Sequence, residues 1–315
     1  MTPVVRVAAG VVRVLGMNPG PFTLCGTNTY LIGTGERRVL VDTGDGEQSA
    51  YFTTLKNCLG GCRIGQILLT HWHADHIGGV SRLLDMPDLV TPDCSVHKCP
   101  DAVTDSSDDV VAMLELATTR DKLRSISDGE LFDAGGGLQL QAVFTPGHTS
   151  DHMSFTIRPP TDPSALLVLT GDLVLGSGTS VVHNLSQYMD SLQRLLALSP
   201  TALLPGHGTI VSGSESGRHN AVRLLEYYIE HRTMRERQIA DVLSTPPPDT
   251  PPQPRDGGWQ VEEVTAVVYP DITDPRLVRA AQNNTRCHLD KLVHDGRAEV
   301  RHTDGVDLFR IRSPA

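Results

Sequence analysis

The sequence lacks an excess of basic residues and any long apolar run. Its 315 residues carry 27 Lys and Arg against 37 Asp and Glu, for a net charge of −10. A broad basic surface of the kind that binds nucleic acids is therefore absent, and any contact with RNA or DNA has to be local. The longest apolar stretches, such as residues 165–169, are far shorter than the roughly 20 residues of a membrane helix. We therefore expect no membrane association.

The first residues show no secretory signal, because no long apolar segment follows the first charges. An acid-free start with Arg6 and Arg13 is typical of mitochondrial targeting, but the valines around these arginines favour strands of the fold. The six cysteines form no proper double knuckle for zinc. We expect them to be free thiols in a reducing compartment.

The apolar content, 39%, is sufficient for a packed core. Residues 1–244 alternate short β-rich runs with helix-like stretches, which predicts an α/β domain with helices over sheets. Residues 245–258 contain six prolines and are expected to form a semi-rigid linker. The remaining residues, 259–315, are expected to form a small separate unit.

Two helices followed by a hairpin are predicted in that C-terminal unit. The first helix is expected at residues 261–269 and the second from Pro275 to about Asp295. Two β-like runs, at residues 297–301 and 306–312, flank a hairpin signal. This order of elements is typical of a winged-helix domain.

A long amphipathic helix is expected just before the linker, at about residues 217–242. Its arginines could follow a phosphate backbone, but they alternate with glutamates, which favours a solvated helix face. These arginines are Arg218, Arg223, Arg232, Arg235 and Arg237.

The strongest chemical signal is a dense group of metal-binding side chains. Four such residues occupy six positions directly after an apolar strand, namely His71, His73, Asp75 and His76. A strand-to-helix turn directs neighbouring side chains apart, so the first two residues could serve one ion and the last two another. Imidazole together with carboxylate favours zinc, with iron and manganese as alternatives.

Three later strand ends each carry one further ligand beside glycine or proline. They are His148 in Thr-Pro-Gly-His-Thr, Asp172 in Leu-Thr-Gly-Asp and His207 in Leu-Pro-Gly-His-Gly. In layered α/β folds, sites gather at strand ends. We therefore expect these three side chains to complete the metal site.

These motifs closely resemble those of the metallo-β-lactamase superfamily, whose α/β fold is an αββα sandwich with a dinuclear site at one edge. The resemblance implies a hydrolase with two divalent metal ions, with zinc expected first. It assigns His71, His73 and His148 to the first ion, Asp75, His76 and His207 to the second, and Asp172 to a bridge between them. It also implies that Asp42 orients a ligand histidine.

The charge of two neighbouring ions suggests the mechanism. Cations about 3.5–4 Å apart stabilise a hydroxide near neutral pH and polarise the bond that it attacks. A metal-bound hydroxide is thus the expected nucleophile, with Asp75 as the catalytic residue that orients it and accepts its proton. No serine or cysteine with a suitable histidine partner stands out as an alternative nucleophile.

Four residues beside these motifs are candidates for supporting roles or substrate contact. Asn28 could contact the substrate or fix a loop, and could equally belong to a simple turn. Asp151 and His152 are expected to support the ligands, with capping of the next strand as the alternative. Trp72 could stack on a base, although packing is the favoured role.

Further stretches, among them residues 18–33, 145–153 and 231–237, resemble the β-lactamase-like protein 2 group, as does the winged-helix-like tail. That group includes a mitochondrial endoribonuclease that acts on single-stranded RNA. A close branch contains fungal thioesterases that release polyketides from carrier proteins.

Two hydrolase hypotheses follow from this second resemblance. The first is an endoribonuclease that cleaves single-stranded RNA in the mitochondrial matrix, with the cytosol as the alternative compartment. The second is a thioesterase or other acyl hydrolase that acts on an acyl thioester at the same site. Neither implies a stable protein partner. A binding module with a vestigial site is disfavoured, because all seven ligand positions are filled.

Overall fold

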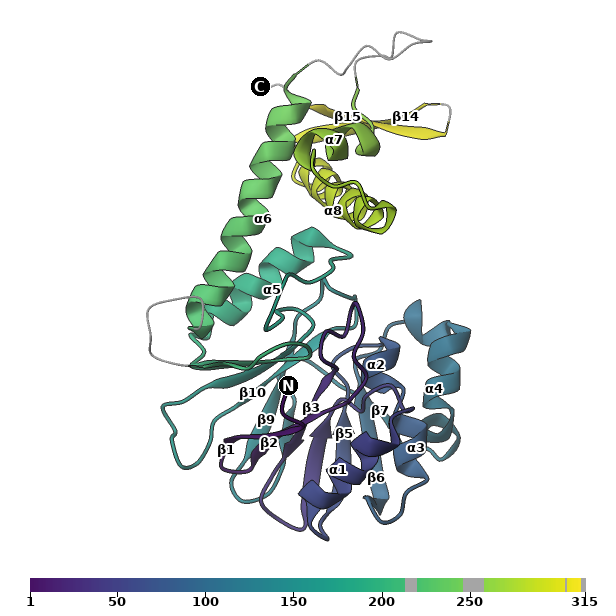
Figure 1. Ribbon diagram of the computed structural model, residues 1–315, viewed down its shortest axis with the longest axis vertical. Coiled ribbons are helices and arrows are strands. Elements are labelled where there is room, and N and C mark those ends of the chain that lie inside the picture. Colours follow the sequence, from purple (N-terminus) through teal and green to yellow (C-terminus); the bar gives the residue numbers. More distant parts are fainter. Residues whose placement is uncertain (213–219, 246–257, 304, 313–315) are drawn as a thin grey trace.

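The computed structural model describes residues 1–212, 220–245, 258–303 and 305–312. Two β-sheets pack face to face with helices on their outer sides, and a small C-terminal unit stands on the long helix α6 (Figure 1). The αββα fold class predicted from the sequence is thereby confirmed. No helix in these ranges is both long enough and apolar enough to cross a membrane.

The first sheet contains seven strands in chain order, antiparallel from β1 to β4 and parallel from β4 to β7. The strands are β1 (Val4–Ala8), β2 (Val11–Leu15), β3 (Asn28–Ile32), β4 (Arg37–Val41), β5 (Arg63–Leu68), β6 (Val90–Lys98) and β7 (Leu123–Ser125). Its helices are α1 (Ser49–Leu59), α2 (Ala74–Ile77), α3 (Val80–Leu84), η1 (Thr104–Ser106) and α4 (Asp108–Thr119). Apolar side chains such as Leu40, Leu55 and Val80 join α1 and α3 to this sheet.

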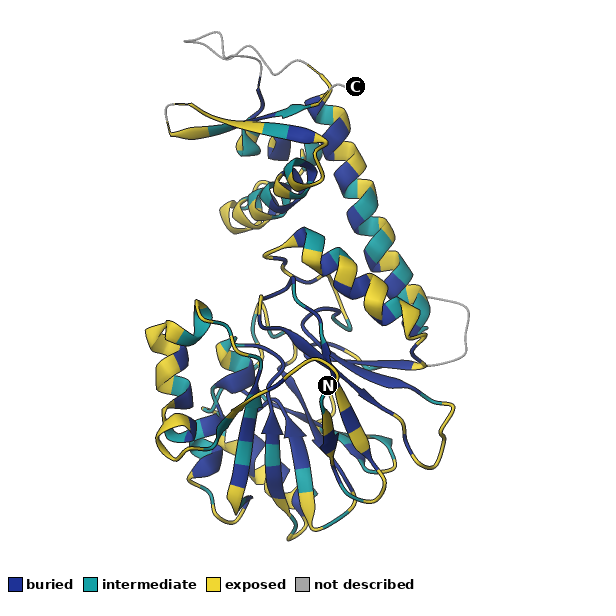
Figure 2. Cartoon of the chain, turned by 180° about the vertical axis from the view of Figure 1, so that it is seen from behind, coloured by how far each residue is buried: buried dark blue, intermediate teal, exposed yellow. Residues whose placement is uncertain are grey.

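The second sheet follows in the chain and contains six strands in the order β13-β12-β11-β10-β9-β8. Its strands are β8 (Leu131–Asp133), β9 (Gln139–Phe144), β10 (Met153–Ile157), β11 (Leu167–Gly171), β12 (Ala202–Pro205) and β13 (Val211–Ser212). Only β11 and β12 pair in parallel. Every residue of β10 and β11 is buried, because one face meets the first sheet and the other is covered by α5 (Leu185–Ala197). Figure 2 shows this buried interior between the two layers.

The C-terminal unit has its own small core against the end of α6 (Ala221–Leu243). It consists of α7 (Val261–Val268), α8 (Pro275–His294) and the hairpin of β14 (Ala298–Thr303) and β15 (Val306–Ile311). Leu289 and Leu292 of α8 pack with Trp259 and Phe309 in this core. The side chain of Asp274 caps α8 by accepting a hydrogen bond from the backbone N–H of Arg276. The predicted order of two helices and a hairpin is therefore present.

Two sequence expectations differ from the structure. The helix expected from residue 217 begins at Ala221, with Asn220 as its cap, and the stretch 213–219 lies outside the described residues. The expected solvated face holds for Arg223 and Arg237, which are exposed, but not for Arg232, which is only 4% exposed. Of the predicted linker at 245–258, residues 246–257 are also outside the described parts.

Candidate metal centre

All seven predicted ligands lie at one edge of the sandwich, directly after the strands that deliver them. The segment that starts at His71 follows β5 of the first sheet. His148, Asp172 and His207 follow β9, β11 and β12 of the second sheet. Both sheets therefore contribute to the site. The ligands form two groups whose ligand atoms lie within 4.8 Å of one another: His71, His73, His148 and Asp172, then Asp75, His76 and His207.

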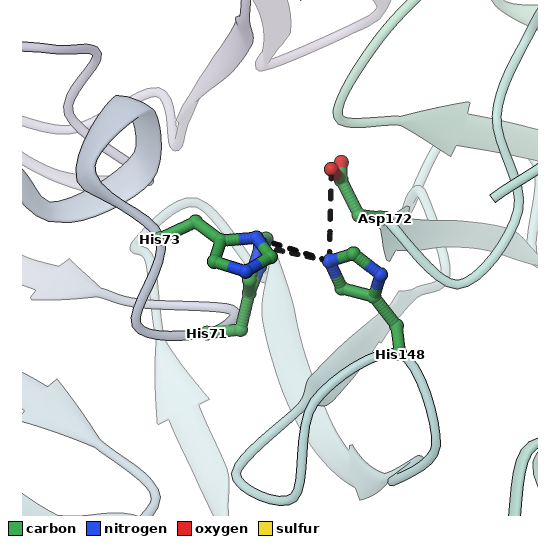
Figure 3. A group of neighbouring side chains, drawn as sticks. All are labelled: His71, His73, His148 and Asp172. Carbon is green, nitrogen blue, oxygen red and sulfur yellow. Dashed lines mark hydrogen bonds and ion pairs between the residues drawn. The ribbon is translucent and has the colours of Figure 1, made fainter. Parts of the chain in front are cut away.

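Three imidazole nitrogens of the first group face a common point (Figure 3). Nε2 of His71 lies 2.9 Å from Nδ1 of His73 and 3.3 Å from Nε2 of His148. The His148 and His73 nitrogens are 3.2 Å apart. The carboxylate of Asp172 lies 3.8 Å from Nε2 of His148.

The partners of these imidazoles determine where their protons are. Nδ1 of His148 donates to the carbonyl of Val181 at 2.7 Å, so its Nε2 carries a lone pair. The hydroxyl of Thr70 donates its proton to Asp42, so Oγ1 of Thr70 accepts a hydrogen bond from Nδ1 of His71. Nε2 of His71 therefore also carries a lone pair. Lone pairs that face each other at this distance repel, and a cation between them removes the repulsion. The donor set therefore fits a divalent metal ion.

The second group alternates imidazoles with carboxylates. Oδ2 of Asp75 lies 3.2 Å from Nε2 of His76 and 3.2 Å from Nε2 of His207. Asp172 stands between the groups, with Oδ2 3.2 Å from His207 and Oδ1 3.5 Å from His76. Oδ1 of Asp172 is buried and accepts no hydrogen bond from the described residues. One carboxylate thus faces both groups, as a bridging ligand must.

Burial and neighbouring charge make the two groups electrostatically different. Burial above all lowers the pKa of the three imidazoles of the first group, that of His73 to about 3, so they are neutral donors. In the second group, burial lowers the pKa of the imidazoles but neighbouring carboxylates outweigh it. Asp75 is the main cause of the raised pKa of His76, and Asp172 is the main cause of the raised pKa of His207, which reaches about 9. Conversely, these imidazoles hold the pKa of Asp75 and Asp172 well below its usual range. The carboxylates therefore stay charged and attract cations.

Glycines before two of the ligands leave room for the site. At Gly206, a Cβ atom would lie 2.4 Å from Oδ1 of Asp172 and 2.9 Å from Cε1 of His76. At Gly147, with φ of +132°, it would lie 2.4 Å from the backbone of Tyr188. No larger residue fits either position without displacing a ligand or a helix.

Asp42 lies behind the ligands and contacts His76. Its Oδ2 accepts a hydrogen bond from Nδ1 of His76 at 2.7 Å, while the backbone N–H and hydroxyl of Thr70 donate to the same carboxylate. Asp42 has φ of 60°, a conformation uncommon for a residue with a side chain. This strained position aims the carboxylate at His76 and away from solvent.

Asn28 fixes a loop and does not line the pocket. Its Nδ2 donates to the carbonyls of Pro205 and Gly208, at 2.9 and 3.0 Å, on either side of His207. The hydroxyl of Tyr30 also donates to Pro205. Because Asn28 is fully buried, the substrate-contact interpretation is not supported by its position.

His152 contacts the ligand residue Asp172, whereas Asp151 lies in a buried ion pair. The ring of His152 accepts the backbone N–H of Asp172 at Nε2 and contacts Oγ1 of Thr145 through Nδ1. Asp151 pairs with the buried amine of Lys98 at 2.8 Å. His152 therefore fixes the chain at Asp172, and Asp151 fixes the segment that follows His148 to Lys98 of β6.

A pocket of about 570 Å³ opens over both groups of ligands. Its apolar wall consists of Pro21, Phe22, Leu24, Trp72, Leu175 and Val181. Its polar wall includes two serines, one glycine and one threonine at residues 177–180. Among the described residues that line it, none is Lys or Arg. Trp72 lines this pocket and also packs against the core of the first sheet.

The sequence interpretation missed several residues that shape the site. His183 lies at the pocket wall, and its ring stacks on His148 with centroids 6.2 Å apart. Phe22 and Leu24 fall within the stretch 18–33, and like Lys98 and Ser180 they belong to none of the ligand motifs. A histidine near a loop of glycines and serines was the one available signal for His183.

Residues 22–207 match the family described as the metallo-beta-lactamase superfamily, and residues 261–305 match the beta-lactamase associated winged helix domain. A protein of Drosophila melanogaster named beta-lactamase-like protein 2 homolog is 35% identical over 97% of this chain and 95% of its own length. Lactamase-like protein nscB of Arthroderma gypseum is 34% identical over 95% of this chain and 86% of its length.

A solved structure agrees with these matches at the level of the fold. The crystal structure of a beta-lactamase domain protein from Burkholderia ambifaria superposes with a TM-score of 0.74, at 19% identity. The superposition covers 98% of this chain and 93% of that one. From the converging ligands, the sandwich and these matches, we conclude that the chain belongs to the metallo-β-lactamase superfamily of metal-dependent hydrolases.

Proposed function

We propose that the protein hydrolyses an acyl thioester or ester with an apolar acyl group, using two zinc ions. The observation that carries the proposal is the pocket directly above the ligands. Its wall is largely apolar, and none of its described lining residues is Lys or Arg. An acyl chain gains free energy from burial against such a wall, whereas a phosphate chain needs cations along its path.

The ligand residues in this proposal are the seven described above. His71, His73 and His148 would hold one ion, Asp75, His76 and His207 the other, and Asp172 would face both. Zinc is proposed because imidazole dominates the donor set. When bound, two such ions supply an activated water and polarise the carbonyl under attack.

The chain itself contributes a proton acceptor and a substrate wall. The side chain of Asp75 is 23% exposed and lines the pocket, so its carboxylate can accept a proton from the attacking water. Oγ1 of Thr27 donates to Oδ2 of Asp75 at 2.7 Å and fixes the carboxylate. Hydrolysis then joins the water oxygen to the acyl carbon, and the thiol leaves with a proton.

Cleavage of single-stranded RNA is the second candidate. Two aromatic side chains, Phe22 and Trp72, line the pocket, and Phe22 is 81% exposed. Aromatic rings of this kind stack on unpaired bases. The winged-helix match at residues 261–305 gives this candidate a second domain that could hold the RNA.

A paired assay separates the two candidates. Zinc-loaded protein is incubated in parallel with a medium-chain acyl thioester and with a labelled single-stranded RNA. We expect thioester turnover, and we expect Asp75→Ala to reduce it by at least about 10²–10⁴-fold, because the variant loses the proton acceptor and also a ligand of the second ion. Metal analysis of the same samples checks that two ions are bound.

Asp109→Ala is the matched control, since Asp109 is exposed in the first turn of α4. That variant should retain full activity. RNA cleavage that Asp75→Ala abolishes, without thioester turnover, would replace the first candidate by the second. A metal-loaded protein that cleaves neither would contradict both.

A further inference from the structure

One loop forms the pocket wall that faces the C-terminal part of the chain. We call residues 173–183 the pocket loop; it follows Asp172 and ends with His183 at the start of α5. Leu175 and Val181 from this loop line the pocket. The loop therefore lies between the candidate ligands and helices α6 and α8.

The pocket loop also orients His148. The carbonyl of Val181 accepts the hydrogen bond from Nδ1 of His148 at 2.7 Å. Oγ of Ser180 lies 3.2 Å from the same nitrogen and donates to the backbone carbonyl of Asp172. The direction of the His148 lone pair thus depends on where residues 180 and 181 lie.

Arg232 of α6 holds the loop at this point. Its Nη2 donates to the carbonyl of Ser180 at 2.7 Å, and the guanidinium lies 5.5 Å from the ring centre of Tyr188. The side chain is buried, and within the described ranges no carboxylate pairs with it. Burying an arginine without a counter-charge costs desolvation free energy. A buried position of this kind therefore indicates a role other than that of a surface charge on the helix.

Two further side chains fix the loop on either side of that contact. The hydroxyl of Tyr228, also on α6, donates to the carbonyl of Gly178 at 2.9 Å and accepts the N–H of Leu175 at 3.1 Å. The thiol of Cys287 on α8 donates to the carbonyl of Val182 at 3.1 Å. All three side chains come from helices beyond residues 22–207, the part that matches the hydrolase family.

We infer that Arg232 is a positioning residue for the metal centre: through the pocket loop it sets the orientation of His148. The inference rests on the proposed function only in that the seven ligands bind two ions. It makes the long helix and the C-terminal unit part of the metal site, although neither supplies a ligand. Loss of the Arg232 contact should therefore weaken the binding of the ion that His148 holds more than the binding of the other ion.

The test is a metal titration of the full chain. The metal-free protein is titrated with Co²⁺, whose visible absorption reports ligand geometry, and zinc affinities follow from competition with a chelator. Arg232→Met should raise the Kd of one ion by about 10–100-fold, the usual effect of losing a group that orients a ligand. Arg232→Lys retains a donor and should recover part of this loss.

Two companion variants keep the test decisive. Arg237→Met removes an exposed arginine from the same helix and should change neither affinity. Tyr228→Phe removes only the hydrogen bonds of the Tyr228 hydroxyl to the same loop. It should therefore weaken binding of the same ion, and it provides the test if Arg232→Met does not fold.

Unchanged affinities in folded Arg232→Met and Tyr228→Phe would overturn the inference, as would equal weakening of both ions. Failure of wild-type protein to bind two ions would instead contradict the proposed function.

Discussion

Three ligands in the candidate centre are held by residues that bind no metal themselves. His76 is held by Asp42, His148 by Val181 and Ser180, and the backbone of Asp172 by His152. Such partners fix the ring and the tautomer, so that the lone pair needs no rearrangement when an ion arrives.

Asp42→Asn tests one of these partners. The carboxylate accepts hydrogen bonds from His76 and twice from Thr70, and an amide in its place would turn an N–H₂ towards a donor. We expect about 10–100-fold weaker metal binding and a loss of about 1–3 kcal/mol in the free energy of unfolding. Chelator competition and urea unfolding measure the two effects.

Asp45→Asn on the same loop is the control, because Asp45 is half-buried, its side-chain hydrogen bonds stay within its own turn, and it contacts no ligand side chain. It should leave metal affinity unchanged. A normal metal affinity for Asp42→Asn would show that the carboxylate does not orient His76.

His288 predicts a pH dependence of stability away from the metal centre. It is 1% exposed, and in the described part of the chain neither ring nitrogen has a hydrogen-bond partner. Burial lowers its pKa to about 3, aided by the neighbouring Arg232, Arg235, His231 and Lys291. Between pH 6.5 and about 3, His288 is protonated in the unfolded chain but stays neutral in the folded state. Stability should therefore fall as the pH drops from 6.5 towards 3, by about 2 kcal/mol between pH 6.5 and 5 from this group.

Comparison with His288→Met isolates that contribution, because other buried histidines titrate in the same range. Urea unfolding of both proteins at several pH values should show a shallower decline for the variant. Parallel curves would mean that the ring is protonated, or solvated, in the folded state.

The residues that sequence could identify are those whose neighbours also carry information. His148 and His207 each follow a Pro-Gly pair at a strand end, and that local pattern marks them as candidate ligands. Arg232 has no such mark, because it is one of several arginines at helical spacing. Its burial depends on a contact with Ser180, 52 positions earlier in the chain.

At the scale of elements, α8 joins the C-terminal unit to the rest of the molecule. One part of it packs in the small core with Leu289 and Leu292, and Cys287 reaches the pocket loop. Its beginning was predictable, because an aspartate followed by proline is a strong helix start. Which face it buries was not, since that depends on the position of α6.

Leu292→Ala should destabilise this unit. Leu292 is fully buried, and removal of a buried leucine side chain costs about 2–5 kcal/mol, depending on how far the cavity collapses. Leu277→Ala on the same helix is the control, since Leu277 is 58% exposed and its loss should be worth less than about 0.5 kcal/mol. Urea unfolding of the two variants compares them, and equal effects would contradict the packing described for α8.

At the scale of the whole molecule, alternating strands and helices predicted an α/β domain with helices over sheets, and the αββα sandwich followed from the resemblance of the ligand motifs to a known family. Which strands belong to which sheet was not predictable, because the pairing of strands does not follow from their positions in the sequence. The first sheet uses residues 4–125 and the second uses residues 131–212, so the two layers are consecutive halves of one stretch of chain.

This arrangement has a consequence for how the protein matures. Four of the ligand positions belong to the first half and three to the second, so neither half carries a complete set for either ion. During synthesis the first half emerges alone, with His71 and His73 lacking their third imidazole. Full-strength capture of metal can begin only after His207 has been made and the layers have closed on each other. Binding of both ions would therefore distinguish chains whose two halves have packed together from chains in which they have not.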